Sequence, residues 1–286
     1  MERMTFMNGD SVWCVDNDHC FEEQSEHYCG PAIERLAAYE DIGLTPEEVE
    51  GLMEVCPPPE EAEIYTGERR GGLKVLELFA GTRSIGKAFE ARGHEVFSVE
   101  WSKDFDNIDL YADILTVTAE DILEKFGRPD VIWASPDCAT FSIAAISHHR
   151  RRNPETGNLD PVSEYAKFCD RVDQHVLRMI MALSPKYWFI ENPRGGMRKM
   201  EWMEGLPRHT VTYCQYGDTR MKPTDIWTNH PEPRFKPMCK NGDPCHVAAP
   251  RGAKTGTQGL KGSQERSVIP AALCEHIVDI CEEAER

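Results

Sequence analysis

The stretch DVIWASPDCATFS, Asp130–Ser142, decides how the rest of the chain is interpreted. Val131–Trp133 is a short apolar run with β propensity, and the polar break Ser135–Asp137 ends it. Cys138 follows at once. A thiol just beyond the carboxyl end of a buried parallel strand lies where α/β sheets hold ligands and catalytic groups. A half-buried structural thiol is the alternative, and the surrounding sequence has to distinguish the two.

Apolar runs and helical segments alternate on both sides of this stretch. Strands are expected at residues 73–79, 94–101, 109–114, 130–136 and 186–193, and helices within 80–93 and at 119–127, 163–183 and 270–283. The longest helix has apolar residues at three- and four-residue spacing, which is typical of an amphipathic helix packed on a sheet. This alternation predicts an α/β fold with a doubly wound, mostly parallel sheet.

Composition indicates a reducing compartment. The chain has 286 residues, of which 40% are hydrophobic, and contains no run of 18 apolar residues and no leader pattern. Its 11 cysteines are odd in number and irregular in spacing, which does not suit a disulfide framework. We therefore expect a cytoplasmic monomer without a membrane segment.

Charged residues are unevenly distributed along the chain. The net charge is −17, but residues 1–70 hold 18 acidic and 4 basic side chains, whereas residues 219–262 hold 8 basic and 3 acidic ones. A polyanionic partner responds to such local charge more than to the total. The expected domains are an acidic, helical module with its linker at 1–62, the main domain at 63–227, a small basic segment at 228–262, and a C-terminal helix at 263–286 that completes the main domain.

The first half of the main domain is typical of a nucleotide-binding βαβ unit. A strand, a turn containing Gly81, a helix and a second strand ending in Glu100 follow in order, and Glu100 lies 19 residues after Gly81. In dinucleotide-binding folds an acidic residue about 20 residues after the glycine-rich turn accepts hydrogen bonds from the ribose hydroxyls. Trp101 could present its ring to an adenine. A purely structural turn and a core tryptophan are the alternatives.

Five motifs together resemble the DNA cytosine-5 methyltransferases, of a compact phage or bacterial type. They are ELFAGTRSIGKAF (77–89), VEW (99–101), ADI (112–114), SPDCATFS (135–142) and IENP (190–193), in the family's order. The resemblance implies a Rossmann-like fold, S-adenosylmethionine as cofactor and DNA as substrate. It also implies that residues 228–262 recognise the target sequence. The chain departs from the family pattern at Asp137 and Ala139, which flank the cysteine, and at Pro193.

The resemblance also implies roles for individual residues. The catalytic residues would be Cys138, Glu191 and either Arg220 or Lys222. The cofactor would be held by Phe79, Ala80, Gly81, Glu100, Trp101, Asp113, Ile114, Pro136 and Ser267. DNA would be contacted by Ser142, His148, His149, Arg150, Arg151 and Arg152, expected as a mobile basic loop.

The chemistry explains why these residue types are needed. C5 of cytosine is a poor nucleophile until a thiolate adds at C6, and cysteine is suited to this addition because sulfur is a soft nucleophile that later leaves. A carboxyl group at N3 and a cation at O2 would stabilise the charge that develops on the ring. The base must be flipped out of a duplex or presented in a single strand. Asp137 does not fit this scheme, because a neighbouring carboxylate disfavours the thiolate.

Several alternatives remain open from sequence alone. The same chemistry on tRNA or another RNA is one, and a catalytically inactive nucleic-acid-binding relative is another. Zinc could be bound near the N-terminus, or by Cys239, Cys245 and His246 with a fourth ligand from elsewhere. The N-terminal candidates are Cys14, His19, Cys20, His27 and Cys29. Ordinary thiols are the favoured interpretation of both sets, so no metal ligand is assigned.

Overall fold

The computed structural model describes residues 5–8, 11–14, 22–24, 27–29, 72–143, 145–240, 242–247, 265 and 267–284. The chain divides into two compact units, Met1–Thr66 and Gly67–Arg286.

The N-terminal unit contains a small antiparallel sheet. Its strands are β1 (Thr5–Asn8), β2 (Ser11–Cys14), β3 (Glu22–Gln24) and β4 (His27–Cys29), in the order β1-β2-β4-β3. The sequence analysis expected a helical module here and did not anticipate these strands. Residues 30–71 lie outside the described residues, as do His19 and Cys20 of the N-terminal zinc candidates.

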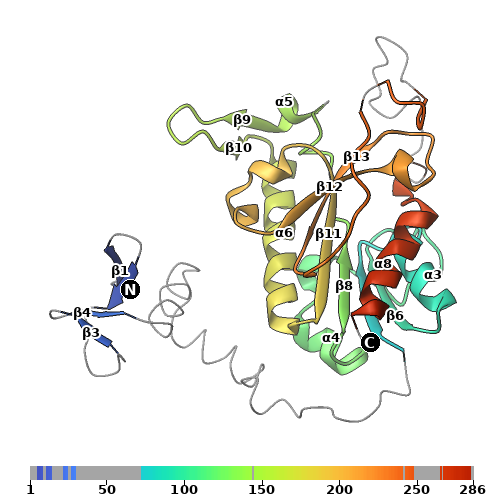
Figure 1. The fold of residues 1–286 in the computed structure, drawn as a ribbon, viewed down its shortest axis with the longest axis horizontal. Coiled ribbons are helices and arrows are strands. Elements are labelled where there is room, and N and C mark those ends of the chain that lie inside the picture. Colours follow the sequence, from blue (N-terminus) through green and yellow to red (C-terminus); the bar gives the residue numbers. More distant parts are fainter. Residues whose placement is uncertain are drawn as a thin grey trace. The chain divides into compact units, whose positions relative to one another are not determined.

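A seven-stranded sheet forms the centre of the second unit (Figure 1). Its strands, in the order β12-β13-β11-β8-β5-β6-β7, are mostly parallel, and only β13 runs antiparallel to its neighbours. The strand bounds are β5 (Lys74–Leu78), β6 (Glu95–Glu100), β7 (Leu110–Tyr111), β8 (Val131–Ala134), β11 (Tyr187–Pro193), β12 (Arg208–Thr212) and β13 (Pro223–Thr228). The predicted α/β, mostly parallel sheet is confirmed.

Helices cover both faces of this sheet, as the doubly wound prediction requires (Figure 1). On one face α4 (Ala119–Lys125) and α6 (Glu164–Leu183) bury an apolar cluster that includes Ile122 and Val176. On the other face α3 (Ser84–Ala91) and α8 (Ala271–Glu283) bury a second cluster that includes Phe89 and Ile277. None of the helices in the described ranges combines the length and apolar character needed to cross a membrane.

Local signals explain where the helices begin. Thr118 and Asp121 form a reciprocal capping box at the start of α4. Ser163 Oγ accepts a hydrogen bond from the Ala166 N–H at 3.1 Å at the start of α6. These caps satisfy amide groups that would otherwise lack partners in the first helical turn.

The basic stretch after Cys138 is more regular than expected. It forms the short helix α5 (Ile146–His149) and the strand β9 (Arg150–Arg152), which pairs antiparallel with β10 (Leu159–Pro161). The remaining connections contain the 3-10 turns η1 (Ile114–Thr116), η2 (Met197–Lys199), η3 (Glu201–Met203) and η4 (Tyr213–Tyr216). The sequence analysis expected a mobile loop here and did not anticipate the short helix and the hairpin.

The carboxyl ends of the central parallel strands meet at one edge of the sheet. Ile190 of β11 pairs with Ala134, the last residue of β8, so Glu191 lies level with the start of the loop that carries Cys138. Ligands of open α/β sheets bind at this edge. The fold thus gathers the sequence motifs at one end of the sheet.

Candidate active site

Hydrogen bonds shape the loop that carries Cys138. The Cys138 carbonyl accepts hydrogen bonds from the backbone N–H groups of Phe141 at 3.1 Å and Ser142 at 2.9 Å. Asn192 of β11, fully buried, donates from Nδ2 to the Pro136 carbonyl at 3.1 Å. Buried side-chain amides of this kind hold backbone in place because leaving the carbonyl unpaired is costly. The loop is therefore tied to the strand that carries Glu191.

Gly195, just after β11, allows a close approach to the same loop. A Cβ atom added at Gly195 would lie 2.4 Å from the Phe141 carbonyl oxygen. The neighbouring Gly196 N–H donates to that oxygen at 2.7 Å. Any larger residue at position 195 would therefore displace the segment that follows the nucleophile candidate.

Asp137 has two partners that account for its position beside Cys138. Its Oδ1 accepts from the Ala139 N–H at 2.5 Å, and its Oδ2 accepts from the Tyr165 hydroxyl of α6 at 2.6 Å. Burial, together with the charge and hydrogen bond of Asp137, raises the pKa of Tyr165, so the phenol stays a donor. Asp137 thus closes the turn after the thiol and anchors it to α6.

Charges of both signs act on the Cys138 thiol. Burial and the carboxylates of Asp137 and Glu191 together raise the pKa of Cys138 to about 11, and the charge of Lys222 opposes them. The thiol is therefore protonated at neutral pH in the unliganded protein.

Tyr213 connects Glu191 with Lys222. Its hydroxyl donates a hydrogen bond to Glu191 Oε1 at 3.0 Å, and Lys222 Nζ lies 4.4 Å from the centre of its ring. Glu191 is buried in β11, and Tyr213 is fully buried at the start of η4. A cation over an aromatic face is attracted by the ring quadrupole. No motif of the sequence indicated Tyr213, which follows the unpredicted strand β12.

Arg220 has a different environment from Lys222. It is buried and pairs through its guanidinium with Asp218, with Nε 2.9 and 3.0 Å from the two carboxylate oxygens. Its Nη1 also donates to the Glu265 carbonyl at 3.3 Å. Arg220 thus ties the end of η4 to the C-terminal segment. Of the two residues that the sequence left open, Arg220 therefore has its guanidinium engaged by Asp218, whereas the charge of Lys222 acts on Cys138.

The turn after β5 is held by Glu100, at the end of β6. Glu100 Oε2 accepts from the Gly81 N–H at 3.0 Å, and Oε1 accepts from the N–H groups of Trp101 and Ser102, each at 3.0 Å. Gly81 has φ +49°, a conformation that glycine adopts without strain. Phe79, which begins the turn, adopts a similar φ of +56°. Glu100 is therefore a positioned carboxylate at the strand end.

Trp101 beside it is unusually exposed. Its side chain is 73% exposed, although tryptophan is normally among the more buried residues. An exposed indole next to an oriented carboxylate is the combination that a nucleoside would use, one for its base and one for its ribose. The residues present at this strand end therefore fit S-adenosylmethionine.

The other proposed cofactor residues surround the same edge. Ala80 donates its N–H to the Val99 carbonyl at 3.1 Å, and Pro136 is buried beside Asn192. Asp113 accepts from the Leu115 N–H at 3.0 Å and so begins η1, which buries Ile114. Ser267 is exposed, and two residues later Ile269 donates its N–H to Ser84 Oγ, at 3.4 Å, at the start of α3.

Arg150 does not have the predicted DNA-facing position. It is 2% exposed and forms an ion pair with Asp170 of α6, with Nη2 2.5 Å from Oδ1 and Nη1 3.2 Å from Oδ2. It also donates from Nε to the Thr140 carbonyl at 3.2 Å and lies 4.1 Å over the Phe141 ring. The expected contact with a phosphate is wrong for Arg150, because its donors are directed into the protein. The residue instead clamps the Cys138 loop to α6.

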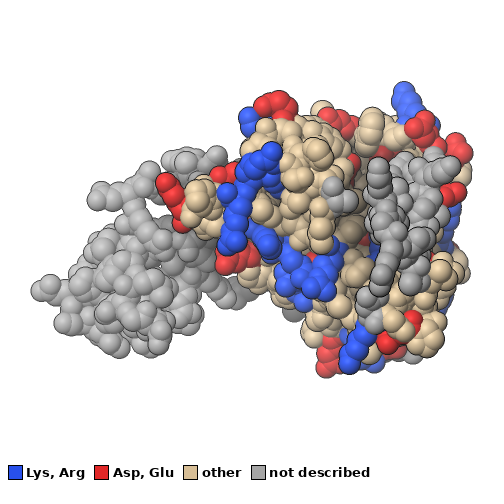
Figure 2. Space-filling view, turned by 90° about the horizontal axis from the view of Figure 1, so that it is seen from above, with Lys and Arg blue, Asp and Glu red and all other residues tan. Residues whose placement is uncertain are grey.

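The other basic residues lie nearer the surface. His148, Arg151 and Arg152 are exposed, whereas Ser142 and His149 are half-buried. His149 Nδ1 is 2.9 Å from Ser163 Oγ, the cap of α6. Figure 2 views the end of the molecule that carries β9 and β10 and shows Lys and Arg side chains gathered on it. A surface of this kind can contact phosphates near the loop of Cys138.

Comparison with known proteins gives one sequence relative. No protein-family model matches the chain. The "Probable DNA (cytosine-5)-methyltransferase" of Frog virus 3 (isolate Goorha) is 28% identical over 226 residues, which cover 73% of this chain and 100% of the viral protein.

Two solved structures align over about half of the chain. One is a candidate DNA modification methyltransferase encoded within an E. coli prophage, with a TM-score of 0.41 and 16% identity over 55% of this chain and 46% of that one. The other is the Entamoeba histolytica methyltransferase EhMeth, with a TM-score of 0.40 and 12% identity over 56% of this chain and 53% of that one. The chain thus spans about half the length of these two structures. The resemblance to the DNA cytosine-5 methyltransferases that the motifs indicate is confirmed by the viral relative and extends over most of the chain.

Proposed function

We propose that this protein transfers a methyl group from S-adenosylmethionine to C5 of cytosine in DNA, through a covalent bond between Cys138 and C6. One observation supports this most strongly. Tyr213 contacts both a buried carboxyl group, Glu191, and a cation, Lys222, and the charges of these two residues act on the thiol of Cys138. The similarity to the viral protein named as a DNA (cytosine-5)-methyltransferase supports the same reaction.

Cys138 begins the proposed reaction. Its sulfur loses its proton to solvent and adds to C6 of the cytosine. The C5–C6 bond becomes single, N3 takes up a proton, and C4 and C5 with the exocyclic amino group become an enamine that is nucleophilic at C5. When bound, the cofactor supplies the electrophilic methyl group. Afterwards the C5 proton leaves and the Cys138–C6 bond breaks, which restores the aromatic ring and the free thiol. No net oxidation or reduction occurs in this sequence.

Glu191 and Lys222 would stabilise the charge that develops on the ring. Glu191 hydrogen-bonds or protonates N3, and Lys222 faces O2, which becomes more negative as sulfur adds. The pKa of about 11 for Cys138 makes this assistance necessary, since little thiolate exists at neutral pH before the base is bound. Lys222 also favours the thiolate directly through its charge.

The cofactor would lie at the carboxyl ends of β5 and β6. Glu100 would accept hydrogen bonds from the ribose hydroxyls, and the exposed ring of Trp101 would contact the adenine. Ser267 would contact the cofactor, since Ile269, two residues later, contacts the start of α3. Asp113 and Ile114 would border the adenine.

The DNA would approach the surface that carries the exposed residues His148, Arg151 and Arg152. The target cytosine has to leave the duplex to reach Cys138, which implies base flipping. We assign catalysis to residues 63–227 together with 263–286, target recognition to 228–262, and a separate role to 1–62. We place the protein in the cytoplasm as a monomer, and the described cysteines from Cys138 onward, none of which is in a disulfide, suit that reducing compartment.

The test is incubation with labelled S-adenosylmethionine and mixed-sequence duplex DNA, followed by base-resolution mapping of 5-methylcytosine. Single-stranded DNA and tRNA are assayed in parallel. Methylation at C5 in DNA is the expected result. Methyl transfer only to RNA would redirect the proposal to RNA, and no transfer to any substrate together with retained DNA binding would favour an inactive relative.

A further inference from the structure

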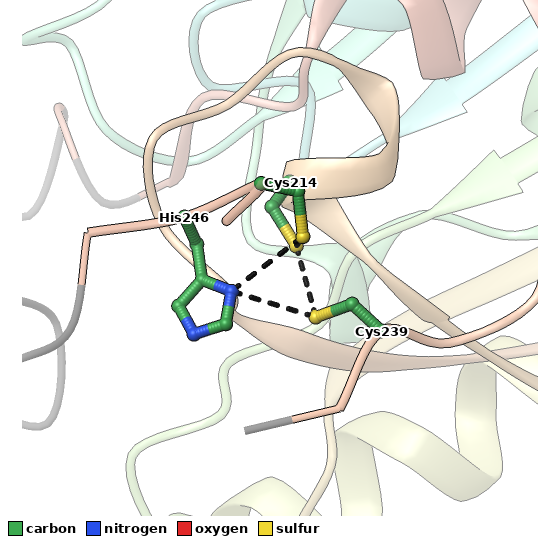
Figure 3. Close-up of side chains that lie close together, drawn as sticks. Cys214, Cys239 and His246 are labelled. Atoms are coloured by element: carbon green, nitrogen blue, oxygen red, sulfur yellow. Dashed lines mark hydrogen bonds between the residues drawn. The ribbon is translucent and has the colours of Figure 1, made fainter. Parts of the chain in front are cut away.

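Three cysteines and one histidine outside the active site converge in a single cluster. The ligand atoms of Cys214, Cys239, Cys245 and His246 all lie within 4.8 Å of one another. Figure 3 shows Cys214, Cys239 and His246 pointing toward a common centre. Cys214 and Cys239 are buried, and the other two are half-buried. Four soft or borderline donors that face one another without a carboxylate are the donor set of a metal site rather than of a general ion cluster.

The separations match a tetrahedron around one ion. The sulfur of Cys214 lies 3.2 Å from that of Cys239 and 3.6 Å from that of Cys245, and His246 Nδ1 lies 3.6 Å from each of the sulfurs of Cys239 and Cys245. With Zn–S of about 2.3 Å and Zn–N of about 2.0–2.1 Å, tetrahedral angles place two sulfurs about 3.8 Å apart and a sulfur and a nitrogen about 3.6 Å apart. These four separations therefore lie within about 0.6 Å of the tetrahedral values.

We propose that Cys214, Cys239, Cys245 and His246 bind one structural Zn²⁺ ion. Three thiols and one imidazole fill all four tetrahedral positions, so no position remains for water or substrate. Each thiol loses its proton on binding, so three protons are released for each zinc ion bound. The sequence analysis recognised Cys239, Cys245 and His246 but assigned no metal. It lacked the fourth ligand, because Cys214 lies 25 residues before Cys239.

The ion would join two segments that backbone contacts already bring together. The Cys239 N–H donates to Thr212 Oγ1 at 3.0 Å, and the Val247 N–H donates to the Thr219 carbonyl at 2.9 Å. One segment, residues 239–247, lies within the expected target-recognition region. The other, residues 212–219, contains η4, which begins with Tyr213, the partner of Glu191. We therefore infer that zinc holds the recognition segment against the part of the chain that positions the catalytic carboxyl group, a role that rests on the proposed function, whereas zinc binding itself does not.

Metal analysis of the full-length protein tests the site directly. The protein is purified without chelator, and zinc and protein are quantified in the same sample. We expect one zinc ion per chain in the wild type and a large loss of zinc in Cys239→Ser and in Cys245→Ser. Cys138→Ser is the matched control, because it makes the same chemical change outside the cluster and should retain its zinc. Full zinc retention in both cluster variants would overturn the proposal.

A second measurement uses the wild-type protein alone, so it does not depend on whether the variants fold. The wild type is stripped of metal, reduced and titrated with Co²⁺, which should give an intense thiolate-to-cobalt charge-transfer band and the visible spectrum of a tetrahedral ion, with saturation at one equivalent. Adding zinc should abolish the spectrum and raise the unfolding temperature. A weak octahedral cobalt spectrum would refute the site. So would a Cys214–Cys239 disulfide, found by thiol counting in freshly isolated protein that contains no metal.

Discussion

Replacing Arg150 with methionine should destabilise the catalytic domain rather than weaken DNA binding. The Arg150 side chain is fully buried and its partner Asp170 is 10% exposed, so the substitution leaves a nearly buried carboxylate without its cation. It also removes the hydrogen bonds to Thr140, with Nε 3.2 Å from the carbonyl and Nη2 3.1 Å from Oγ1. Removing one partner of a buried ion pair costs about 3–5 kcal/mol.

This loss should be visible in thermal unfolding. A domain of roughly this size loses about 2–4 °C in Tm per kcal/mol, so we expect a decrease of roughly 6–20 °C. The measurement is thermal unfolding followed by circular dichroism at neutral pH. Fluorescence anisotropy with a labelled duplex at several salt concentrations measures DNA affinity on the same samples, below the lowered Tm.

Arg152→Met is the matched control, because Arg152 lies in the same strand but is exposed. It should leave Tm nearly unchanged and reduce the salt dependence of DNA binding by about one phosphate contact. The reasoning is refuted if Arg150→Met keeps the wild-type Tm while its DNA affinity and salt dependence fall.

Three further outcomes follow from the site. Tyr213→Phe removes the hydrogen bond to Glu191, which is worth about 1.5–3 kcal/mol when the partner is charged. Its loss should lower kcat roughly ten- to a hundredfold and leave cofactor affinity unchanged. An unaltered kcat would exclude a role of Tyr213 in positioning Glu191. Lys222→Met removes the charge that lowers the pKa of Cys138, so that pKa rises above about 11 and adduct formation slows at neutral pH. In the wild type and in Lys222→Met, the rate of adduct formation, measured by rapid quenching, should increase as the pH rises toward the pKa of the thiol. A rate that is independent of pH between 7 and 9 would contradict this. Trp101→Ala should weaken cofactor binding in calorimetry without lowering Tm, because the ring is 73% exposed; equal affinity would remove Trp101 from the cofactor site.

The parallel part of the sheet could be predicted because its strands are buried on both faces. β5, β8 and β11 read as continuous apolar runs, and turn or cap residues separate them from amphipathic helices. β12, RHTVT, and β13, PTDIWT, carry polar residues that pair inside the fold, so no apolar run marked them. The strands β9, RRR, and β10, LDP, are only three residues long and show no apolar alternation, so the sequence analysis expected a loop there.

Residues of the candidate site that belong to a sequence motif could be predicted, whereas residues that join the site only through tertiary contacts could not. Cys138 and Glu191 each follow from a local pattern. The partners of Asp137 and of Glu191 are Tyr165 and Tyr213, which lie 28 and 22 residues away and belong to no motif. The burial of Arg150 could not be predicted either. A run of three arginines normally indicates a solvated basic patch, and the ion pair of Arg150 with Asp170 forms only in the folded protein.

The central claim is that Cys138 forms a bond with C6 of the target base, and a trapping experiment tests it most directly. Duplex DNA containing 5-fluorocytosine is incubated with the protein and S-adenosylmethionine, then resolved by denaturing electrophoresis. Fluorine at C5 cannot leave as a proton, so elimination of the cysteine is blocked and the adduct should persist. We expect a stable protein–DNA band with the wild type and none with Cys138→Ser, whose hydroxyl is far less nucleophilic at neutral pH. A wild-type protein that methylates cytosine at C5 in ordinary DNA but forms no such band would contradict the covalent mechanism.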